Sequence, residues 1–548
     1  MRRSRAFFAG VVLLQLALLQ LSLCGAEAKK AAPKKDLAAR IAAVLAQPQL
    51  ARADWGIDVV DLKTGKTIYA RNADRLFLPA SNAKLLTTSA AMAYLGPNYR
   101  FRTTVETTGQ IDAAGRLDGD LVIVGRGDPN ISGRELPYYL KSQSNPPHTQ
   151  ILEDMANQIA QSGLKTVTGD IIGDDTFYAP QRYPDGWAQD DLQWLDGAPI
   201  SALTFNDNSI FLKVAPAAQP GDKALVTFEP QSNYYELDNR IITAPAGTAR
   251  KVGIHRDPGS RKILLWGVLP QADTGFTEAI SIEDPAEFTA EIFRSLLEAR
   301  GITIAGKARA RHGDLAQFFD QIPPQDAAPV PSPAPDVSAC CGTHASSPAS
   351  PDGSATPPVP QPPQSTILAL HMSLPLIEDI RVINKTSQNL HAELALRLIG
   401  AQSEDNNSYE GGIAALQKFL HGAGVTDEEY SFTDGSGLSR RDLITPAAMV
   451  RVLLHDAKQT WGPALEESLP VAGVDGSLTD RFLNTQAMGR VHAKTGTLSH
   501  VSALSGYGQT LSGRRFAFSI FCNKINLPSS KAAAAIDQIV RLLVGAGR

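Results

Sequence analysis

The sequence has few cysteines, no excess of charge of one sign and, beyond its first residues, no long hydrophobic run. Four cysteines in 548 residues exclude a disulfide scaffold and a metal site with several thiolate ligands. The 52 Lys and Arg residues nearly balance the 56 Asp and Glu residues, so no strong positive field exists to hold a nucleic acid, and we expect no such partner. With 43% hydrophobic residues the chain is globular, and its length corresponds to roughly three to four domains.

The N-terminus carries the one apolar run that could enter a membrane. Three arginines precede it, it extends from Phe7 to Leu23, and Ala26-Glu27-Ala28 supplies the small residues of a signal peptidase site. We therefore predict that residues 1–28 are a cleaved secretory signal and that the mature protein is periplasmic or otherwise extracytoplasmic. An uncleaved anchor is the alternative, because the run has the minimum length for crossing a bilayer. The basic run at 29–35 is typical of a solvated tail, and weak membrane association stays open.

Residues 36–100 and 365–548 show the same mixture of strands and helices. In the first segment, alternating apolar residues predict two strands joined by a turn at Thr64-Gly65, followed by a helix between Pro79 and Gly96. In the second segment, apolar patterns predict strands and helices, with strands at 501–508 and 516–522 and helices at 390–399, 446–454 and 530–544. We therefore predict one α+β domain, an antiparallel sheet flanked by helices, that is built from both chain ends.

The middle of the chain has a different character. Between 101 and 322, short β-type runs such as Leu121–Gly125 and Ile263–Leu269 are separated by Gly, Asp and Asn, and a helix at 284–300 closes the region. This pattern predicts inserted β-rich domains, one nested in the other. Residues 323–364 are mainly Pro, Ser and Ala with few large apolar side chains, so we predict that they form a disordered linker.

Three short motifs combine residue types that serine chemistry requires, and the first is Ser81-Asn82-Ala83-Lys84 at the start of the predicted helix. Positions i and i+3 share a helix face, so the Lys84 amine can reach the Ser81 hydroxyl. A nucleophilic serine without histidine needs such a base, and burial or a second cation can lower the pKa of the lysine. A second Ser-x-x-Lys, at 162–165, contains a glycine that ends a helix, and we reject it.

The second motif is Ser387-Gln388-Asn389, directly before a predicted helix. Serine and asparagine are both good helix N-caps, so this motif alone is compatible with a purely structural role. Its place in the chain, between the first and the third motif, makes it a candidate catalytic element.

The third motif, Lys494-Thr495-Gly496-Thr497, lies on or beside a predicted strand. On an edge strand it would offer a cation, a hydroxyl and an unencumbered backbone to an extended peptide that ends in a carboxylate. The sequence Lys63-Thr64-Gly65 repeats the same residues, but it lies in the first predicted turn, upstream of Ser81. We assign to that copy a role in the turn only.

The order of the three motifs is more specific than any one of them. Ser-x-x-Lys, Ser-x-Asn and Lys-Thr-Gly follow one another as in the penicillin-recognising serine acyl-transferases, here with a long first gap. The chain resembles the D-alanyl-D-alanine carboxypeptidase/endopeptidase family of class C low-molecular-mass penicillin-binding proteins, the S13 peptidases, over nearly all of residues 38–545. Further matching segments are 78–81, 121–129, 169–175, 201–203 and 434–440. The segment 323–364 is not part of the resemblance.

The resemblance implies an acyl-enzyme mechanism. Ser81 would be the nucleophile that becomes esterified, and Lys84 would be the general base. Ser387 would relay a proton to the leaving group, and Asn389 would hold both the substrate amide and Lys84.

The resemblance also implies a substrate class, peptidoglycan stem peptides that end in D-Ala-D-Ala, with β-lactams as covalent inhibitors. Lys494 would bind the terminal carboxylate and help to keep Lys84 neutral. Thr495 would add a hydrogen bond to the substrate, and Gly496 would be a further substrate-binding residue. The N–H groups of Ser81 and Thr497 would form the oxyanion hole. No metal or cofactor is required.

Other interpretations stay open. A serine β-lactamase shares the fold and the motifs, although the inserted domains argue against it, and a non-catalytic cell-wall scaffold protein is opposed by the intact motifs. The sequence does not distinguish a carboxypeptidase from an endopeptidase. His391 and Glu393 are expected to have core or capping roles, Cys522 to be buried on a strand, and the turn at 434–437 to be as much a simple turn as a part of the site.

Overall fold

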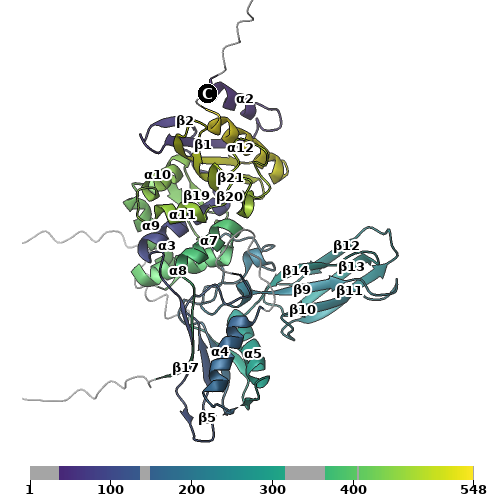
Figure 1. Cartoon of the computed structure of the whole chain (residues 1–548). Helices are drawn as coiled ribbons and strands as arrows, with labels where there is room; N and C mark the ends of the chain where they lie inside the picture. The colour runs from purple at the N-terminus through teal and green to yellow at the C-terminus, as the bar shows by residue number, and fades with distance from the viewer. Residues whose placement is uncertain (1–35, 136–147, 315–364, 404–406, 547–548) are drawn as a thin grey trace, which may run out of the picture.

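The structure, a computed structural model, describes residues 36–135, 148–314, 365–403 and 407–546. Figure 1 shows an elongated molecule with two regions. The main domain, residues 36–100 and 374–546, lies at the top and contains both ends of the described chain. The inserted region, residues 101–373, lies below it and extends an arm to one side.

A five-stranded antiparallel sheet forms the centre of the main domain. Its strand order is β2-β1-β22-β21-β20, so the first two strands of the chain lie beside the last three. The strands are β1 (Asp54–Asp61), β2 (Thr67–Arg71), β20 (Val491–Leu498), β21 (Val501–Gln509) and β22 (Arg515–Asn523). The expected fold class, an antiparallel sheet built from both chain ends and flanked by helices, is confirmed.

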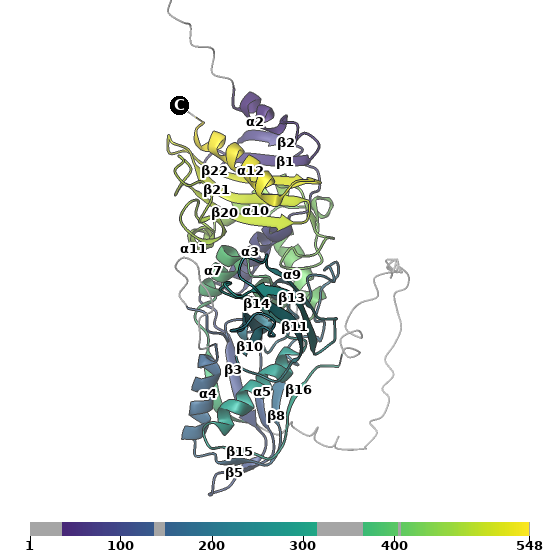
Figure 2. The same ribbon diagram turned by 90° about the vertical axis from the view of Figure 1, so that its right-hand side faces the viewer.

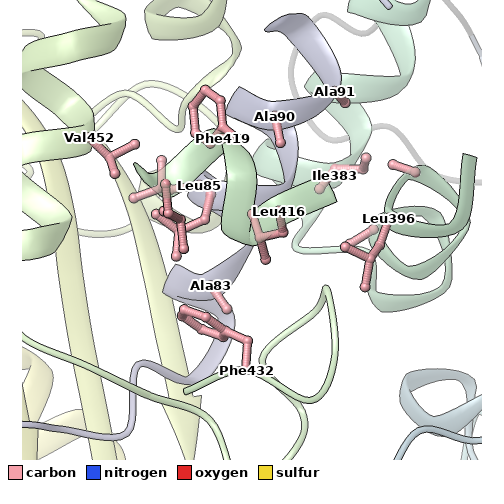
Figure 3. Packing of buried hydrophobic residues seen from close by; sticks show 14 of the residues in the cluster. Ala83, Leu85, Ala90, Ala91, Ile383, Leu396, Leu416, Phe419, Phe432 and Val452 are labelled. Carbon is pink, nitrogen blue, oxygen red and sulfur yellow. The ribbon is translucent and has the colours of Figure 1, made fainter. Parts of the chain in front are cut away.

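Helices cover both faces of this sheet. On one face, α2 (Leu37–Leu45) and α12 (Ser529–Val544) enclose a buried apolar cluster. On the other face lies a layer of helices, namely α3 (Ala83–Tyr94), α7 (Leu376–Thr386), α8 (Asn389–Ser403), α9 (Tyr409–Gly422), α10 (Pro446–Asp456) and α11 (Gly462–Ser468). Figure 3 shows the core of this layer, where Leu85 of α3, Leu416 of α9 and Val452 of α10 belong to one buried cluster. This core fixes α3, the helix that follows Ser81.

The first unit of the inserted region is a mixed sheet with helices. Its strand order is β16-β8-β6-β3-β17, in which β8 pairs parallel with β6 and β16 while β3 pairs antiparallel with β6 and β17. The strands are β3 (Arg102–Thr107), β6 (Leu121–Val124), β8 (Ile171–Asp174), β16 (Ala308–Arg311) and β17 (Thr366–Met372). Helices α4 (Gln150–Gln161) and α5 (Pro285–Glu298) pack against this sheet and against each other, as Figure 2 shows. A small second sheet combines β4 (Gln110–Ile111), β5 (Arg116–Asp118), β7 (Thr166–Val167) and β15 (Thr303–Ile304).

The second unit is the arm, which lies between β8 and α5 in the chain (Figure 1). One of its sheets has the order β10-β9-β14, with β9 (Ser209–Ala215), β10 (Leu225–Glu229) and β14 (Phe276–Ser281). The other has the order β11-β13-β12, with β11 (Glu236–Ala244), β12 (Lys251–His255) and β13 (Lys262–Pro270).

Local sequence explains where two of the helices begin. The Thr445 side chain accepts a hydrogen bond from the N–H of Ala448 over 3.0 Å, and Pro446 occupies the first turn of α10. Before α5, the Asp284 side chain accepts from the N–H of Glu287 over 3.1 Å, and a proline again follows the cap. Both helices therefore begin where the sequence predicts them.

The inserted region differs from the sequence-based expectation in two respects. Helices α4 and α5, together with the parallel pairs of β8, give its first unit a mixed α/β character in place of a purely β-rich one. In addition, the second part of the main domain was expected from residue 365, whereas β17 pairs with β3, from Thr366 opposite Thr107 to Met372 opposite Arg102. The pattern within a short strand indicates that it is a strand but not which strand it pairs with.

The predicted signal at 1–28 and the Pro-rich segment at 323–364 lie outside the described residues, so both stay predictions. Cys522 lies on β22 and is buried, as expected. Within the four described ranges, no helix combines the length and the apolar character that crossing a membrane requires.

Candidate active site

Ser81 and Lys84 lie at the junction of a short 3₁₀ helix, η1 (Ala80–Asn82), and α3. Ala80 has a left-handed φ of +48°, an uncommon conformation for a residue with a side chain. The Nζ atom of Lys84 donates a hydrogen bond to Oγ of Ser81 over 3.0 Å. The expected i, i+3 contact between the amine and the hydroxyl is therefore present.

Lys84 is completely buried, and two further oxygen atoms surround its amine. Nζ donates to Oδ1 of Asn389 over 2.5 Å and to the backbone carbonyl of Ser436 over 2.6 Å. The three acceptors come from η1, α8 and the turn at 434–437, and each of them is formally uncharged. Such a setting holds the amine in place without an ion pair.

The electrostatic setting of Lys84 favours a free amine near neutral pH. Burial lowers the pKa of Lys84 to about 8, although nearby carboxylates, of which Asp434 and Glu393 have the largest effect, act in the opposite direction. Burial, followed by the charge of Lys84, lowers the pKa of Lys494 well below its usual value. Burial is therefore the main cause of the low pKa of Lys84, and the repulsion between the two lysines acts on Lys494.

The second motif connects the ends of two helices. Ser387 follows α7 with a left-handed φ of +66°, and Asn389 is the first residue of α8. Oγ of Ser387 accepts a hydrogen bond from Nζ of Lys494 over 2.8 Å. Nδ2 of Asn389 donates to the carbonyl of Asp196, in the inserted region, over 2.8 Å, which directs Oδ1 towards Lys84. These side chains thus contact the two lysines.

The third motif lies on β20, the edge strand of the main sheet, as predicted. Gly496 is required there, because a Cβ atom would lie 2.6 Å from the carbonyl oxygen of Pro79. The Lys494 carbonyl accepts a hydrogen bond from Nδ2 of Asn82 over 3.0 Å, so β20 is fastened directly to η1. Oγ1 of Thr495 lies 2.7 Å from Oγ of Ser477.

A cleft of about 450 Å³ brings these motifs together. The motif residues that line it are Ser81, Ser387, Asn389, Thr495 and Thr497. Other lining residues come from the inserted region and from the loops around the cleft, namely Asp191, Asp196, Thr386, Gly437, Leu438, Arg440, Leu498 and Ser499. Lys84 and Lys494 are completely buried, and both donate to serine side chains that line the cleft.

The turn at 434–437 is part of this arrangement as well as a turn. Oδ1 of Asp434 accepts from the N–H of Gly437 over 2.7 Å, which is ordinary turn chemistry. Gly437 also lines the cleft, and a Cβ atom there would lie 2.0 Å from the carbonyl oxygen of Ala80. The carbonyl groups of Ser436 and Asp196 escape sequence reasoning, because a backbone contact leaves no signal in the residue type.

The rejected copies of the motifs lie away from the cleft. Helix α4 ends at Gln161, so the serine and the lysine at 162–165 do not share a helix, and Lys63-Thr64-Gly65 lies between β1 and β2. His391 is buried between Asp379 and Asp207, consistent with the expected core role. Among the side chains that the structure describes, no group of three or more His, Cys, Asp or Glu residues is arranged to hold a metal ion.

The chain matches a known protein family over most of its length. A sequence model described as the D-Ala-D-Ala carboxypeptidase 3 (S13) family matches residues 37–314 and 356–544. The chain belongs to this family. The predicted resemblance of the chain to the S13 peptidases is thus confirmed, and the matched ranges leave out most of the Pro-rich segment.

The similarity to individual relatives and solved structures covers most of the chain. A D-alanyl-D-alanine carboxypeptidase from Actinomadura sp. (strain R39) is 32% identical over 535 residues, 95% of this chain and 88% of the relative. The carboxypeptidase DacB from Haemophilus influenzae is 24% identical and covers 85% of each chain. The crystal structure of penicillin binding protein 4 (DacB) from H. influenzae has the same fold, with a TM-score of 0.70 at 22% identity, over 92% of this chain and 98% of that chain.

Proposed function

We propose that the protein is a serine-type D-alanyl-D-alanine carboxypeptidase that acts on peptidoglycan stem peptides through an acyl-enzyme on Ser81. The observation that carries the proposal is the buried Lys84 amine, 3.0 Å from Oγ of Ser81, with a pKa lowered to about 8. Membership of the S13 family and the 32% identical D-alanyl-D-alanine carboxypeptidase support the substrate class.

Acylation begins with a proton transfer. The free amine of Lys84 takes the hydroxyl proton of Ser81 while Oγ attacks the carbonyl carbon between the two D-alanines. The tetrahedral intermediate carries its negative charge on the former carbonyl oxygen, and the N–H groups of Ser81 and Thr497 would stabilise it. One such donor is typically worth about 3 kcal/mol.

Collapse of the intermediate breaks the peptide bond and leaves an ester between Ser81 and the shortened peptide. Ser387 would relay to the departing amine of D-alanine the proton that Lys84 took from Ser81, which leaves Lys84 a free amine again. Its hydroxyl accepts a hydrogen bond from Lys494 over 2.8 Å and lines the same cleft as Ser81. A water molecule, deprotonated at Lys84, then attacks the ester and releases the peptide as a carboxylic acid, which restores the Ser81 hydroxyl.

The third motif supplies substrate binding in this mechanism. An extended peptide can add to the edge strand β20, with its terminal carboxylate at Lys494 and Thr495. Lys494 has a strongly lowered pKa in the free enzyme, and an arriving carboxylate would stabilise its protonated form. Substrate binding would therefore charge Lys494 at the moment when the carboxylate needs a cation.

The same chemistry predicts covalent inhibition by β-lactams, whose strained amide would acylate Ser81. The DacB structure from H. influenzae was also determined in complex with a β-lactam. Access to peptidoglycan requires an extracytoplasmic location, which the predicted signal at 1–28 would provide. Cleavage of cross-linked peptides, the D,D-endopeptidase reaction, would use the same steps with a longer amine as the leaving group.

A labelling experiment tests the proposal. The wild type and Ser81→Ala are incubated with a fluorescent penicillin, and D-alanine release from a peptide ending in D-Ala-D-Ala is measured in parallel. We expect a stable label and D-alanine release in the wild type and neither in the variant. Rapid loss of label with little peptide cleavage would indicate a β-lactamase, and stable label without turnover would indicate a scaffold protein.

A further inference from the structure

Glu393 is a buried acid beside the candidate active site that the three motifs do not include. It lies on α8 one turn after Asn389, and only 1% of its surface is exposed. Residues i and i+4 share a helix face, so Glu393 lies on the side of α8 that carries the amide in contact with Lys84. A carboxyl group in such a place needs strong hydrogen-bond donors.

The donors are two consecutive backbone N–H groups of the turn at 434–437. Oε1 of Glu393 accepts from the N–H of Gly435 over 3.0 Å and from the N–H of Ser436 over 2.8 Å, and Oε2 lies 3.1 Å from the N–H of Gly435. The turn lies directly on the helix, because a Cβ atom on Gly435 would lie 2.9 Å from Cβ of Leu396. The next group of this backbone, the Ser436 carbonyl, accepts from Lys84 over 2.6 Å.

We propose that Glu393 is a positioning residue for the general base: it holds the turn at 434–437 so that the Ser436 carbonyl fixes the amine of Lys84 beside Ser81. Helix α8 then positions the Lys84 amine through two contacts, directly through Oδ1 of Asn389 and indirectly through Glu393. Asp434 and Thr87 also bind this backbone, at the N–H of Gly437 over 2.7 Å and at the carbonyl of Gly435 over 2.7 Å, and Glu393 adds the hydrogen bonds that connect it to α8.

The charges around Glu393 give the role a measurable signature. The groups that face it are Lys84 from α3, Asp434 and Asp442 from the loop before α10, Arg397 from α8 and Tyr409 from α9. Burial and Asp434 raise the pKa of Glu393 to about 8. Because both pKa values lie at about 8, Glu393 is partly ionised where Lys84 titrates. This ionised fraction raises the pKa of Lys84, so loss of Glu393 lowers the pKa at which Lys84 becomes a free base.

The proposal rests on the proposed function, and the test uses the rate constant for labelling by fluorescent penicillin as a function of pH. In Glu393→Ala the two N–H groups lose their acceptor. We expect the maximum labelling rate at high pH, the plateau, to be at least about tenfold lower than in the wild type. We also expect the acid limb, the fall of the rate on the acidic side, to lie at lower pH. Glu393→Gln keeps an acceptor oxygen without the charge. We expect it to recover the plateau to within about threefold while its acid limb stays at lower pH.

Both variants should fold, because Asp434 still holds the rest of the turn through the N–H groups of Gly437 and Ser439, over 2.7 and 2.8 Å. The fraction of protein that is labelled at saturation measures the fraction with a folded active site. Asp456→Asn is the matched control, a buried acid that contacts the same helix α3 at Ser89 over 2.6 Å, and its rate and pH profile should equal those of the wild type.

The outcomes separate the two proposals. Absence of label in the wild type would overturn the proposed function itself. A normal wild type with unchanged plateau and acid limb in both Glu393 variants would overturn the positioning role alone. A smaller labelled fraction with wild-type rate constants would also overturn it, since Glu393 would then only support the fold.

Discussion

Two fully buried bases on neighbouring helices of the main domain have pKa values that are shifted in opposite directions. Lys84 on α3 donates to a hydroxyl, an amide oxygen and a backbone carbonyl, and burial lowers its pKa to about 8. His391 on α8 lies between two carboxylates, with Nδ1 2.7 Å from Asp379 and Nε2 3.0 Å from Asp207. Burial opposes its charge as well, but these carboxylates outweigh that effect and raise its pKa to about 9.

The difference separates a reactive group from a structural one. A strongly shifted pKa marks both residues, but only Lys84 is moved towards the free base that a serine nucleophile requires. His391 is held as a cation, and its two partners belong to different parts of the molecule. Asp379 lies on α7 of the main domain and Asp207 in the inserted region, so the imidazolium joins the two regions next to the second motif.

Removing the imidazole should have the largest effect on stability. In His391→Leu, Asp207 and Asp379 stay buried without the cation between them, and the loss of one partner from a buried ion pair typically lowers the free energy of unfolding by about 3–5 kcal/mol. Urea unfolding monitored by fluorescence measures this loss. The penicillin labelling rate of the remaining folded protein should stay within about twofold of the wild type.

Lys84→Met is the matched variant at the other base, and the opposite pattern is expected. Labelling should be lost, because among the described side chains only Lys84 places an amine beside Oγ of Ser81 to take its proton. The free energy of unfolding should change by less than in His391→Leu. If His391→Leu instead kept its stability and lost labelling, the assignment of structural and catalytic roles to the two bases would be reversed.

The pH dependence of the wild type tests the same comparison. Below the pKa of Lys84 the labelling rate should fall about tenfold per pH unit. Because Lys84 must be a free base, the labelling rate should fall as the pH is lowered through about 8. His391 has a folded-state pKa above its ordinary value of 6.5, so its contribution to stability is fully present below about 6.5 and is lost as the pH rises through about 9. Labelling rates and urea midpoints over one pH series measure both, and parallel curves would contradict the comparison.

The sequence predicts the parts of this site that depend on side-chain type. Ser81, Lys84, Ser387, Asn389 and the Lys-Thr-Gly strand could be selected from motif order, because each supplies a functional group that the chemistry needs. The main sheet followed from apolar alternation at both chain ends. The structure brings these residues into one cleft, and their catalytic roles stay predictions for the experiments above.

Other features depend on tertiary contacts that the pattern of residues does not specify. The carbonyl groups of Asp196 and Ser436 act through the backbone, which every residue type has in common. The pairing of β17 with β3 is set by which strand edge is free, and the burial of Glu393 by how closely the turn at Gly435 approaches α8. From the sequence, Glu393 and His391 have the same expected core or capping role. Only their hydrogen-bond partners in the structure distinguish a positioning role from a structural one.

Deletion of residues 325–362 should have the smallest effect, because this segment contains none of the three motifs and few large apolar side chains. The deletion leaves 315–324 and 363–364 between Asp314 and Ser365, 12 residues that reach about 40 Å when extended. These ends lead to β16 and β17, the two edge strands of one five-stranded sheet, which lie about 19 Å apart across the sheet. The shortened loop must also run back along the length of β17, which is about 23 Å. The remaining chain therefore spans the diagonal of about 30 Å. Penicillin labelling of Ser81 should equal that of the wild type, and slower labelling of a deletion protein with wild-type stability would show that this segment contributes to the site.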